Sequence, residues 1–168
     1  SDSPDNLAES LGITKYEIPV NMFNGNSEKS HPLFTTHTDI ENLRHFNTVF
    51  REGEEVIITE KIHGTSSRCS VIYDNNQWLR IAGSKTMQRK YVENSLYWFP
   101  WTLPSVSSFM EEMKSYAQQQ IILCGEIYGK VQKLRYGLPN SYGYAAFGLK
   151  IDEKYVDAED FYFGDRFK

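Results

Sequence analysis

The chain has 168 residues, of which 40% are hydrophobic and 24% charged, so it can form one globular domain with a core of its own. Its formal net charge of −4 excludes a global attraction to nucleic acid, and such a partner would need a local basic patch. It contains no run of about 18 apolar residues and no basic-then-apolar leader, which predicts an intracellular protein, cytoplasmic or in the nucleoid or nucleus, without a membrane span.

The N-terminal part predicts few regular elements. Residues 1–30 are polar and rich in turn-forming residues, which predicts a linker or lead-in before a domain of residues 31–168. Residues 38–46, TDIENLRHF, predict a short helix. Residues 54–59, EEVIIT, predict a β-strand, which would place Lys61 on the connection between two strands.

The sequence of residues 67–151 predicts two pairs of strands with one helix between them. Residues 67–74 and 77–83 flank a DNN turn and form a predicted hairpin. Apolar residues recur at helical intervals over 105–120, and the apolar runs 121–129 and 142–151 predict two more strands. The order of helix, strands, helix and strands, with antiparallel hairpin signals, indicates an α+β fold.

The cysteines, cations and aromatic residues do not by themselves identify a function. Cys69 and Cys124 have apolar or small neighbours and no Cys-x-x-Cys spacing, which predicts buried, reduced thiols. Tyr and Phe, 11 and 10 residues, could serve as core, as partner surface or as platforms for bases. A basic patch, or else ordinary solvated surface charge, could be formed by Lys85, Arg89, Lys90, Lys130, Lys133 and Arg135.

The stretch TEKIHGT, residues 59–65, places Lys61 two residues before a His-Gly pair. A lysine amine that is desolvated or lies near other cations loses its proton readily, and it can then attack the α-phosphorus of a nucleotide. Gly64 lets the backbone turn tightly and approach a ligand. The alternative is a surface lysine beside an ordinary glycine turn.

Two later stretches could contact the same nucleotide. GEIYG, residues 125–129, carries Glu126, whose carboxylate could accept hydrogen bonds from ribose hydroxyls or hold metal-bound waters. Phe147 lies in the next predicted strand, where its ring could stack on a purine. The alternatives are an exposed carboxylate at a strand end and a phenylalanine that belongs to the core.

The motifs EKIHGT, GEIYGKVQ and AFGLKI, in this order, resemble motifs I, III and IIIa of the covalent nucleotidyltransferase superfamily. The Lys-x-His-Gly sequence is similar to the RNA ligases of the bacteriophage RNA ligase 2 type, since DNA ligases and capping enzymes mostly carry Asp at the position of His63. The stretches LGITKYE, DIENLRHF and GEIYGKVQKLRYG resemble the Deinococcus-type nick-sealing RNA ligases. The resemblance spans residues 11–151.

This resemblance implies a covalent nucleotidyltransferase (ATP-grasp-like) fold of mostly antiparallel sheets with flanking helices. It also implies an ATP-dependent RNA ligase that uses Mg²⁺ or Mn²⁺ to offset the charge of the triphosphate. The enzyme would join RNA 3′-OH and 5′-phosphate ends, a nicked duplex being one candidate substrate, through a lysyl-AMP intermediate. A monomer is expected.

By the same resemblance, Lys61 is the nucleophile that takes AMP from ATP, and His63 acts when AMP moves to the RNA 5′-phosphate. Glu126 binds the ribose or a metal-bound water, and Phe147 stacks on adenine. The residues implied to contact the nucleotide are Glu60, Ile62, Gly64, Lys85, Glu126 and Phe147. Those expected to contact RNA are Arg68, Lys130 and Lys133.

The sequence departs from the family pattern at three places. Lys85 stands where the family usually has Arg in motif Ia, which keeps the charge but loses the bidentate fork. Ser66 stands where the phage type has an Asn that contacts RNA. No Glu-Gly pair of motif IV and no Lys-x-Lys of motif V follows residue 151, which predicts an adenylyltransferase domain that is incomplete at its C-terminus.

Two other functions stay open. A non-catalytic nucleotide- or RNA-binding module derived from this fold would keep the pocket and form no covalent adduct. A different covalent nucleotidyltransferase, such as a DNA ligase or a capping enzyme, is the third candidate, and His63 argues against it.

Overall fold

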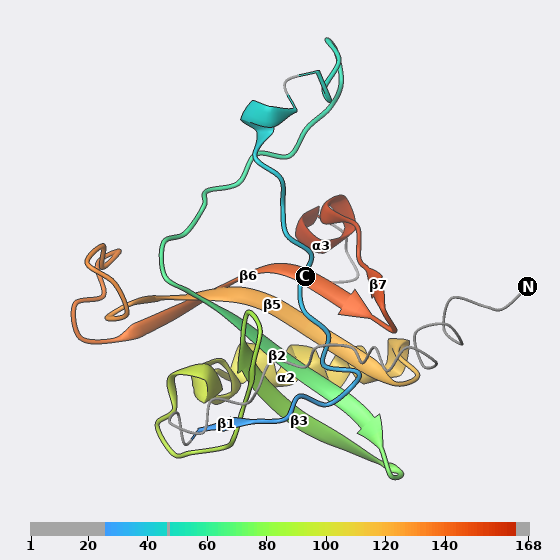
Figure 1. The fold of residues 1–168 in the computed structure, drawn as a ribbon, viewed down its shortest axis with the longest axis vertical. Coiled ribbons are helices and arrows are strands. Elements are labelled where there is room, and N and C mark those ends of the chain that lie inside the picture. Colours follow the sequence, from blue (N-terminus) through green and yellow to red (C-terminus); the bar gives the residue numbers. More distant parts are fainter. Residues whose placement is uncertain (1–25, 47, 164–168) are drawn as a thin grey trace, which may run out of the picture.

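The computed structural model describes residues 26–46 and 48–163, which form a seven-stranded antiparallel sheet with short helices around it (Figure 1). The strands lie in the order β1-β4-β3-β2-β5-β6-β7. Their bounds are Ser27–Glu28 (β1), Thr65–Asp74 (β2), Gln77–Ser84 (β3), Gln88–Arg89 (β4), Gln120–Gly129 (β5), Tyr142–Ile151 (β6) and Lys154–Tyr155 (β7). The predicted mostly antiparallel α+β fold is therefore confirmed.

The helices are short. Among the described residues, the α-helices are α2 (Pro104–Met113) and α3 (Ala158–Phe163), and the 3-10 helices are η1 (Leu43–His45), η2 (Leu96–Thr102) and η3 (Lys114–Tyr116). Helix α2 begins at a proline, whose fixed φ suits the first helical turn and whose missing N–H is not needed there. No helix in the described ranges is long and apolar enough to cross a membrane.

The two central strands, β2 and β5, bury side chains on both faces of the sheet because successive strand residues point to opposite sides. One face packs on η2 and α2; its buried residues include Cys69, Val71, Ile121, Leu123, Trp101, Met110 and Met113. The other face is built from Phe34, Ile72, Ile81, Ile122 and Cys124. Both cysteines are buried free thiols, as expected from their apolar neighbours.

Most of the predicted elements within this sheet are confirmed. The hairpin consists of β2 and β3, joined by Asn75 and Asn76, which both have positive φ angles (48° and 63°) as a two-residue hairpin turn requires. The predicted helix 105–120 is α2 followed by η3, and the two later strands are β5 and β6. The predicted lead-in of residues 1–30 differs, because β1 within it pairs with β4; residues 1–25 lie outside the described residues.

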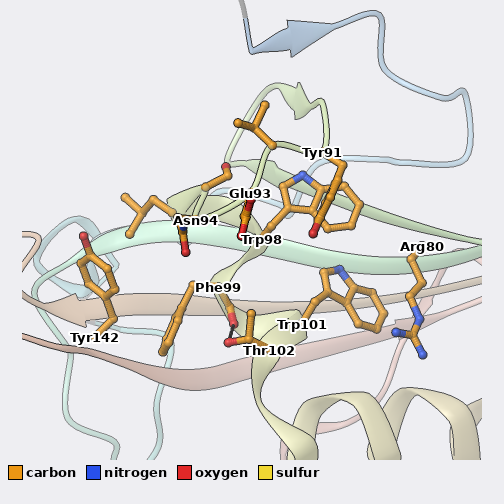
Figure 2. Close-up of a pocket in the computed structure, with 12 residues that line it drawn as sticks. Arg80, Tyr91, Glu93, Asn94, Trp98, Phe99, Trp101, Thr102 and Tyr142 are labelled. Carbon is orange, nitrogen blue, oxygen red and sulfur yellow. Dashed lines mark hydrogen bonds between the residues drawn. The ribbon is translucent and has the colours of Figure 1, made fainter.

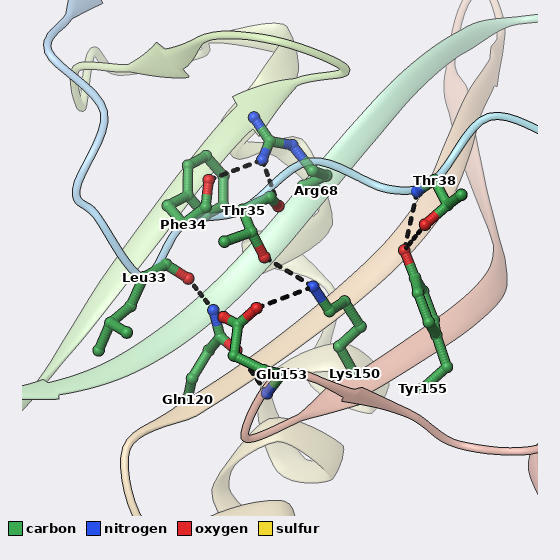
Figure 3. Close-up of polar contacts among 9 residues, drawn as sticks. All are labelled: Leu33, Phe34, Thr35, Thr38, Arg68, Gln120, Lys150, Glu153 and Tyr155. Atoms are coloured by element: carbon green, nitrogen blue, oxygen red, sulfur yellow. Dashed lines mark hydrogen bonds and ion pairs between the residues drawn. The ribbon is translucent and has the colours of Figure 1, made fainter. Parts of the chain in front are cut away.

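Residues 31–38 form a strap that crosses one face of the sheet (Figure 3). Gln120 donates a side-chain hydrogen bond to the carbonyl of Leu33, and the buried Lys150 ammonium donates to the hydroxyl of Thr35 at 2.7 Å. At the end of the strap, the N–H of Thr38 donates to the hydroxyl of Tyr155 at 2.8 Å. These contacts tie the strap to β5, β6 and β7.

Arg68 of β2 holds the same strap from beneath. Its side chain is 1% exposed, and its guanidinium donates to the carbonyls of Phe34 (2.9 Å) and Thr35 (2.6 Å) and to that of Ser84 (2.8 Å). Burial lowers its pKa to about 10. A guanidinium enclosed in this way cannot reach a phosphate at the surface, so the predicted RNA contact of Arg68 is wrong.

Residues 39–46 and 48–62 form an arm that projects from the sheet, in cyan and blue-green (Figure 1). The predicted strand over 54–59 is wrong: these residues pair with no other strand among the described residues, and Ile58 is 90% exposed. The predicted helix over 38–46 is reduced to η1, since its apolar stripe faces no partner and Ile40 is 84% exposed. A short segment with helix or strand propensity is only marginally stable in water when its apolar side chains do not pack against another element.

Candidate active site

A cavity of about 700 Å³ lies between the arm and the sheet. It is lined by two stretches of the arm, by β5 and β6, and by one residue of α3. The lining residues are Ile40, Glu41, Asn42, Thr59, Glu60, Lys61, Ile62, Glu126, Ala145, Ala146, Phe147 and Tyr162. Five of the predicted site residues are therefore brought together here, from three stretches that are distant in the sequence.

Gly64 joins the arm to the sheet at the edge of this cavity. Its N–H donates to Oε1 of Glu126 at 2.9 Å. A Cβ atom at this position would lie 2.1 Å from the carbonyl oxygen of Ile127, far inside any permitted contact. A glycine is required because the backbone passes directly against β5. This close approach fixes the chain three residues after Lys61, just before Thr65 pairs with Ile127.

Two side chains from the connection between β5 and β6 add to this anchor. The hydroxyl of Tyr136 accepts a hydrogen bond from the N–H of His63 at 2.7 Å, and Nε2 of Gln132 donates to the carbonyl of Gly64 at 3.1 Å. The ring of Tyr136 packs edge-on against Tyr128 at 5.4 Å between centroids. Neither Tyr136 nor Gln132 was predicted. The only signal for them is their place in the stretch GEIYGKVQKLRYG, which resembles the nick-sealing ligases.

Phe147 lies in a β-bulge. Ala146 is opposite Gly125 and Gly148 is opposite Cys124, so Phe147 between them has no partner on β5. A bulge bends a strand and re-aims its side chains. As a result Ala145, Ala146 and Phe147 all line the cavity, although a regular strand would alternate them between faces.

The ring of Phe147 is available for stacking. Phe147 is 36% exposed, and its ring lies in a T-shaped arrangement with the ring of His37 of the strap, with 5.5 Å between centroids and an interplanar angle of 78°. Tyr162 of α3 closes the neighbouring wall and donates a long hydrogen bond, 3.5 Å, to the carbonyl of Phe147. Burial raises the pKa of Tyr162, so its hydroxyl remains a donor at neutral pH. Tyr162 was not predicted, because nothing in α3 distinguishes it from its aromatic neighbours.

The predicted cations lie in different places. Lys61 is the only lysine or arginine among the described residues that line the cavity. Lys85 does not line it; the exposed ammonium forms an ion pair with Asp39 at the base of the arm, and this contact lowers the pKa of Asp39. Lys130 and Lys133 are exposed on the connection after β5 and also lie outside the cavity lining.

The carboxylates of the cavity suit a metal ion that is held mainly by a ligand and by water. They are Glu41, Glu60 and Glu126. In the described part of the chain, no three His, Cys, Asp or Glu residues are grouped closely enough to hold a metal by themselves. Mg²⁺ is commonly held by one or two carboxylates together with waters and phosphate oxygens, and Glu126 could supply such a contact.

Comparisons with known proteins agree with this fold. The family model described as RNA ligase matches residues 54–163, well over half of the chain. An Arg-to-Ala mutant of the Naegleria gruberi RNA ligase with ATP and Mn is 19% identical and has a TM-score of 0.61, and the match covers 93% of this chain and 46% of that chain. An apo Asp-to-Ala mutant of the same enzyme is 20% identical with a TM-score of 0.55, covering 92% and 45%.

The chain thus spans less than half the length of these solved structures. At this level of identity the structures show a shared fold and no more. No curated protein gives a significant match. The family model, by contrast, extends from the arm through the last described helix and includes Lys61, Glu126 and Phe147. The chain therefore belongs to the RNA ligase family.

Proposed function

We propose that this chain binds ATP in the cavity beside Lys61 and carries the nucleotidyl-transfer chemistry of an ATP-dependent RNA ligase. The observation that carries the proposal is that Lys61 lines one cavity together with Glu126 and Phe147. Family membership supports it, as does a similar fold in a ligase structure that contains ATP and Mn. Residues 31–168 would then form part of an adenylyltransferase domain.

In the proposed first step, the neutral amine of Lys61 attacks the α-phosphorus of ATP. An N–P bond forms, the bond from this phosphorus to the α,β-bridging oxygen breaks, and pyrophosphate leaves while the amine proton passes to solvent. AMP then moves from Lys61 to the 5′-phosphate of RNA, which regenerates the lysine. Attack of the RNA 3′-OH on this activated phosphate forms the phosphodiester and releases AMP.

The other residues of the cavity have complementary roles. The ring of Phe147 would stack on the adenine. Glu126, which already holds Gly64 through one oxygen, would accept a ribose hydroxyl through its carboxylate or hold a metal-bound water. The main chain of Glu60 and Ile62 would contact the edge of the adenine.

The residues outside the cavity would act on the phosphates and the RNA. His63 lies next to Gly64, with its N–H fixed by Tyr136, and would act in the transfer of AMP to RNA. The exposed Lys130 and Lys133 would contact RNA phosphates at the same end of β5. A bound Mg²⁺ or Mn²⁺ would offset the charge of the triphosphate and of the departing pyrophosphate.

The proposal is tested with ATP labelled at its α-phosphate. The protein is incubated with this ATP and Mn²⁺ and then separated on a denaturing gel, where a covalent adduct keeps the label. The expected result is a labelled wild-type band and an unlabelled Lys61→Ala band. Lys130→Ala, which removes an exposed lysine outside the cavity, serves as the matched control and should stay labelled. Label on Lys61→Ala, or none on the wild type, would contradict the proposal.

One observation favours a second candidate, a nucleotide-binding module without transferase activity. Three carboxylates and only one described cation line the cavity, so little positive charge faces a triphosphate. Such a module would bind ATP in calorimetry, would lose affinity in Phe147→Ala, and would form no covalent adduct under any metal condition. The labelled gel therefore separates the two candidates.

A further inference from the structure

A second cavity, of about 550 Å³, lies beside η2 and the connection that precedes it (Figure 2). None of its lining residues lines the Lys61 cavity, so the two are separate. Both nevertheless use β6: Tyr142 lines this cavity and Ala145 lines the other.

The wall of this cavity is a pair of rings with a fixed orientation. Tyr91 and Trp98 meet edge-to-face, with an interplanar angle of 89° and 5.1 Å between centroids. Nε1 of Trp98 donates to the carbonyls of Arg89 and Lys90, at 3.0 Å each. The indole donor is thus already used, and the ring presents an apolar face. Tyr91 is 71% exposed and adds a second ring surface that a ligand can reach.

Polar groups suited to the edge of a base lie next to these rings. Glu93 and Asn94 are exposed and line the cavity, and within the described residues their side chains take part in no hydrogen bond. A carboxylate accepts hydrogen bonds, and an amide both donates and accepts, as the Watson–Crick edge of an unpaired base requires. A carboxylate inside the cavity also disfavours a phosphate there, so the base is the part that enters.

Positive charge is placed around the cavity. Arg80 is an exposed lining residue whose guanidinium lies over the ring of Trp101 and pairs with Glu111 at 3.0 Å. Lys90 is exposed and directly precedes Tyr91. Exposed cations at the rim of a pocket of rings and base-reading groups match a nucleotide whose base is inserted and whose phosphates stay in solvent.

We propose that this second cavity binds an unpaired nucleobase of an RNA strand by stacking on the exposed ring of Tyr91, against which Trp98 packs at a right angle. The proposal rests on the proposed function, because that function makes RNA the substrate. The other chemistry that aromatic grooves recognise is a proline-rich peptide. It fits less well, since the indole N–H of Trp98 is used within the protein and cannot donate to a peptide carbonyl.

The test is binding of a fluorescent single-stranded RNA, measured by anisotropy without ATP. One stacked base is worth about 1–3 kcal/mol, so Tyr91→Ala should weaken binding by about fivefold or more. Tyr91→Phe keeps the ring and should bind like the wild type. The matched control is Tyr73→Ala, since Tyr73 is also an exposed tyrosine, 40%, in contact with a tryptophan, Trp78, at 5.3 Å. It should change binding less than twofold.

Equal RNA affinity of Tyr91→Ala and Tyr73→Ala would overturn the proposal. So would binding of a proline-rich peptide, but not RNA, through Tyr91. The readout is independent of the labelling reaction, because no ATP is present. Conversely, Tyr91→Ala should be labelled by ATP normally. If the wild type is not labelled by ATP but Tyr91→Ala still binds RNA more weakly, only the proposed function is rejected. If the wild type is labelled but Tyr91→Ala binds RNA as tightly as the wild type, only the role of the second cavity is rejected.

Discussion

The sheet and the arm contain similar apolar sequences with opposite outcomes. In the sheet, the β-branched residues Val71, Ile72 and Ile121 are completely buried in paired strands. In the arm, Val56, Ile57 and Ile58 are exposed and unpaired within the described part of the chain. A strand is therefore determined by a neighbouring strand and a surface to cover, and β-propensity alone does not produce one.

This difference shows how Lys61 is positioned. Lys61 belongs to the arm, yet its location depends on contacts that the sheet makes with the residues that follow it. Gly64 is held by Glu126 and Gln132, and His63 by Tyr136. The site thus depends on a short junction, residues 63–64, between a part of the molecule with few contacts and a part with many.

Breaking the junction should have the largest effect. A methyl group in Gly64→Ala would collide with the carbonyl of Ile127, so the backbone must move away from β5. Labelling by ATP should fall by more than about 100-fold, since a displacement of about 1 Å at a reacting group can cost that much. The glycine control is Gly53→Asn in the arm, where a side chain meets nothing within 4 Å and Asn tolerates the φ of +84°. Similar labelling of both variants would contradict the role of the junction.

Removing the anchor of the strap should destabilise the sheet and leave the arm unaffected. Arg68→Met leaves the carbonyls of Phe34, Thr35 and Ser84 without their donor, at a cost of about 3 kcal/mol in the free energy of unfolding. Arg135→Met, at an exposed arginine, should cost less than about 0.5 kcal/mol. Urea unfolding measures both. Equal midpoints would show that Arg68 is not structural.

The free energy of unfolding should also decrease at acid pH because of one carboxylate, that of Asp152. Burial raises the pKa of Asp152, but hydrogen bonds from the N–H groups of residues 118–120, at 2.7–3.0 Å, outweigh it and hold the pKa below its usual value. A carboxylate whose pKa is lower in the folded than in the unfolded state stabilises the fold at pH values above its unfolded-state pKa, near 3.9. This stability is lost as the pH falls through the folded-state pKa. Asp152→Asn should lower stability at pH 7 by about 1 kcal/mol and flatten the loss below about pH 4.

A control for this pH dependence is Glu52→Gln, which removes an exposed carboxylate of the arm. The acid limb of its stability curve should match that of the wild type. If Asp152→Asn retained the wild-type slope between about pH 4 and pH 2, the carboxylate would not be the group responsible.

The smallest effect is expected when one hydrogen bond of the junction is removed. Tyr136→Phe deletes the hydroxyl that accepts from His63, while Gly64 keeps its bond to Glu126. A single hydrogen bond is worth about 1 kcal/mol, so labelling should slow by about fivefold and the free energy of unfolding should fall by no more than about 1 kcal/mol. Tyr128→Phe keeps the adjacent ring and should label at the wild-type rate. A stronger labelling defect in Tyr128→Phe than in Tyr136→Phe would show that the hydroxyl of Tyr128, and not that of Tyr136, supports the junction.

The sequence predicted the sheet better than the arm. The Asn75–Asn76 turn and the apolar runs that form β5 and β6 are local signals that coincide with the final pairing of the strands. The arm residues 54–59 carry the same signal, but no described strand lies beside them, and one sequence cannot reveal which strands have partners. Arg68 was wrongly predicted to contact RNA. A sequence shows that the residue is charged, but it does not show that three backbone carbonyls accept hydrogen bonds from its guanidinium.

The candidate site was predicted through its motifs and completed by the fold. Lys61, Glu126 and Phe147 were recognisable from short patterns, and all three line one cavity. Tyr136, Gln132 and Tyr162 were not, because their contributions are single contacts made across long sequence separations. The bulge at Phe147 was equally hidden, since it is a mismatch in register between two strands that each look regular.

Hydrogen exchange with and without ATP and Mn²⁺ tests the central claim, that a nucleotide binds between the arm and the sheet at Lys61. Amides of β2 and β5 should exchange slowly in both conditions, because their strands are paired and buried. Amides of residues 40–42 and 59–62 should exchange fast without nucleotide and become protected with it, together with those around Phe147. Protection confined to other parts of the chain, with residues 59–62 unchanged, would contradict the account.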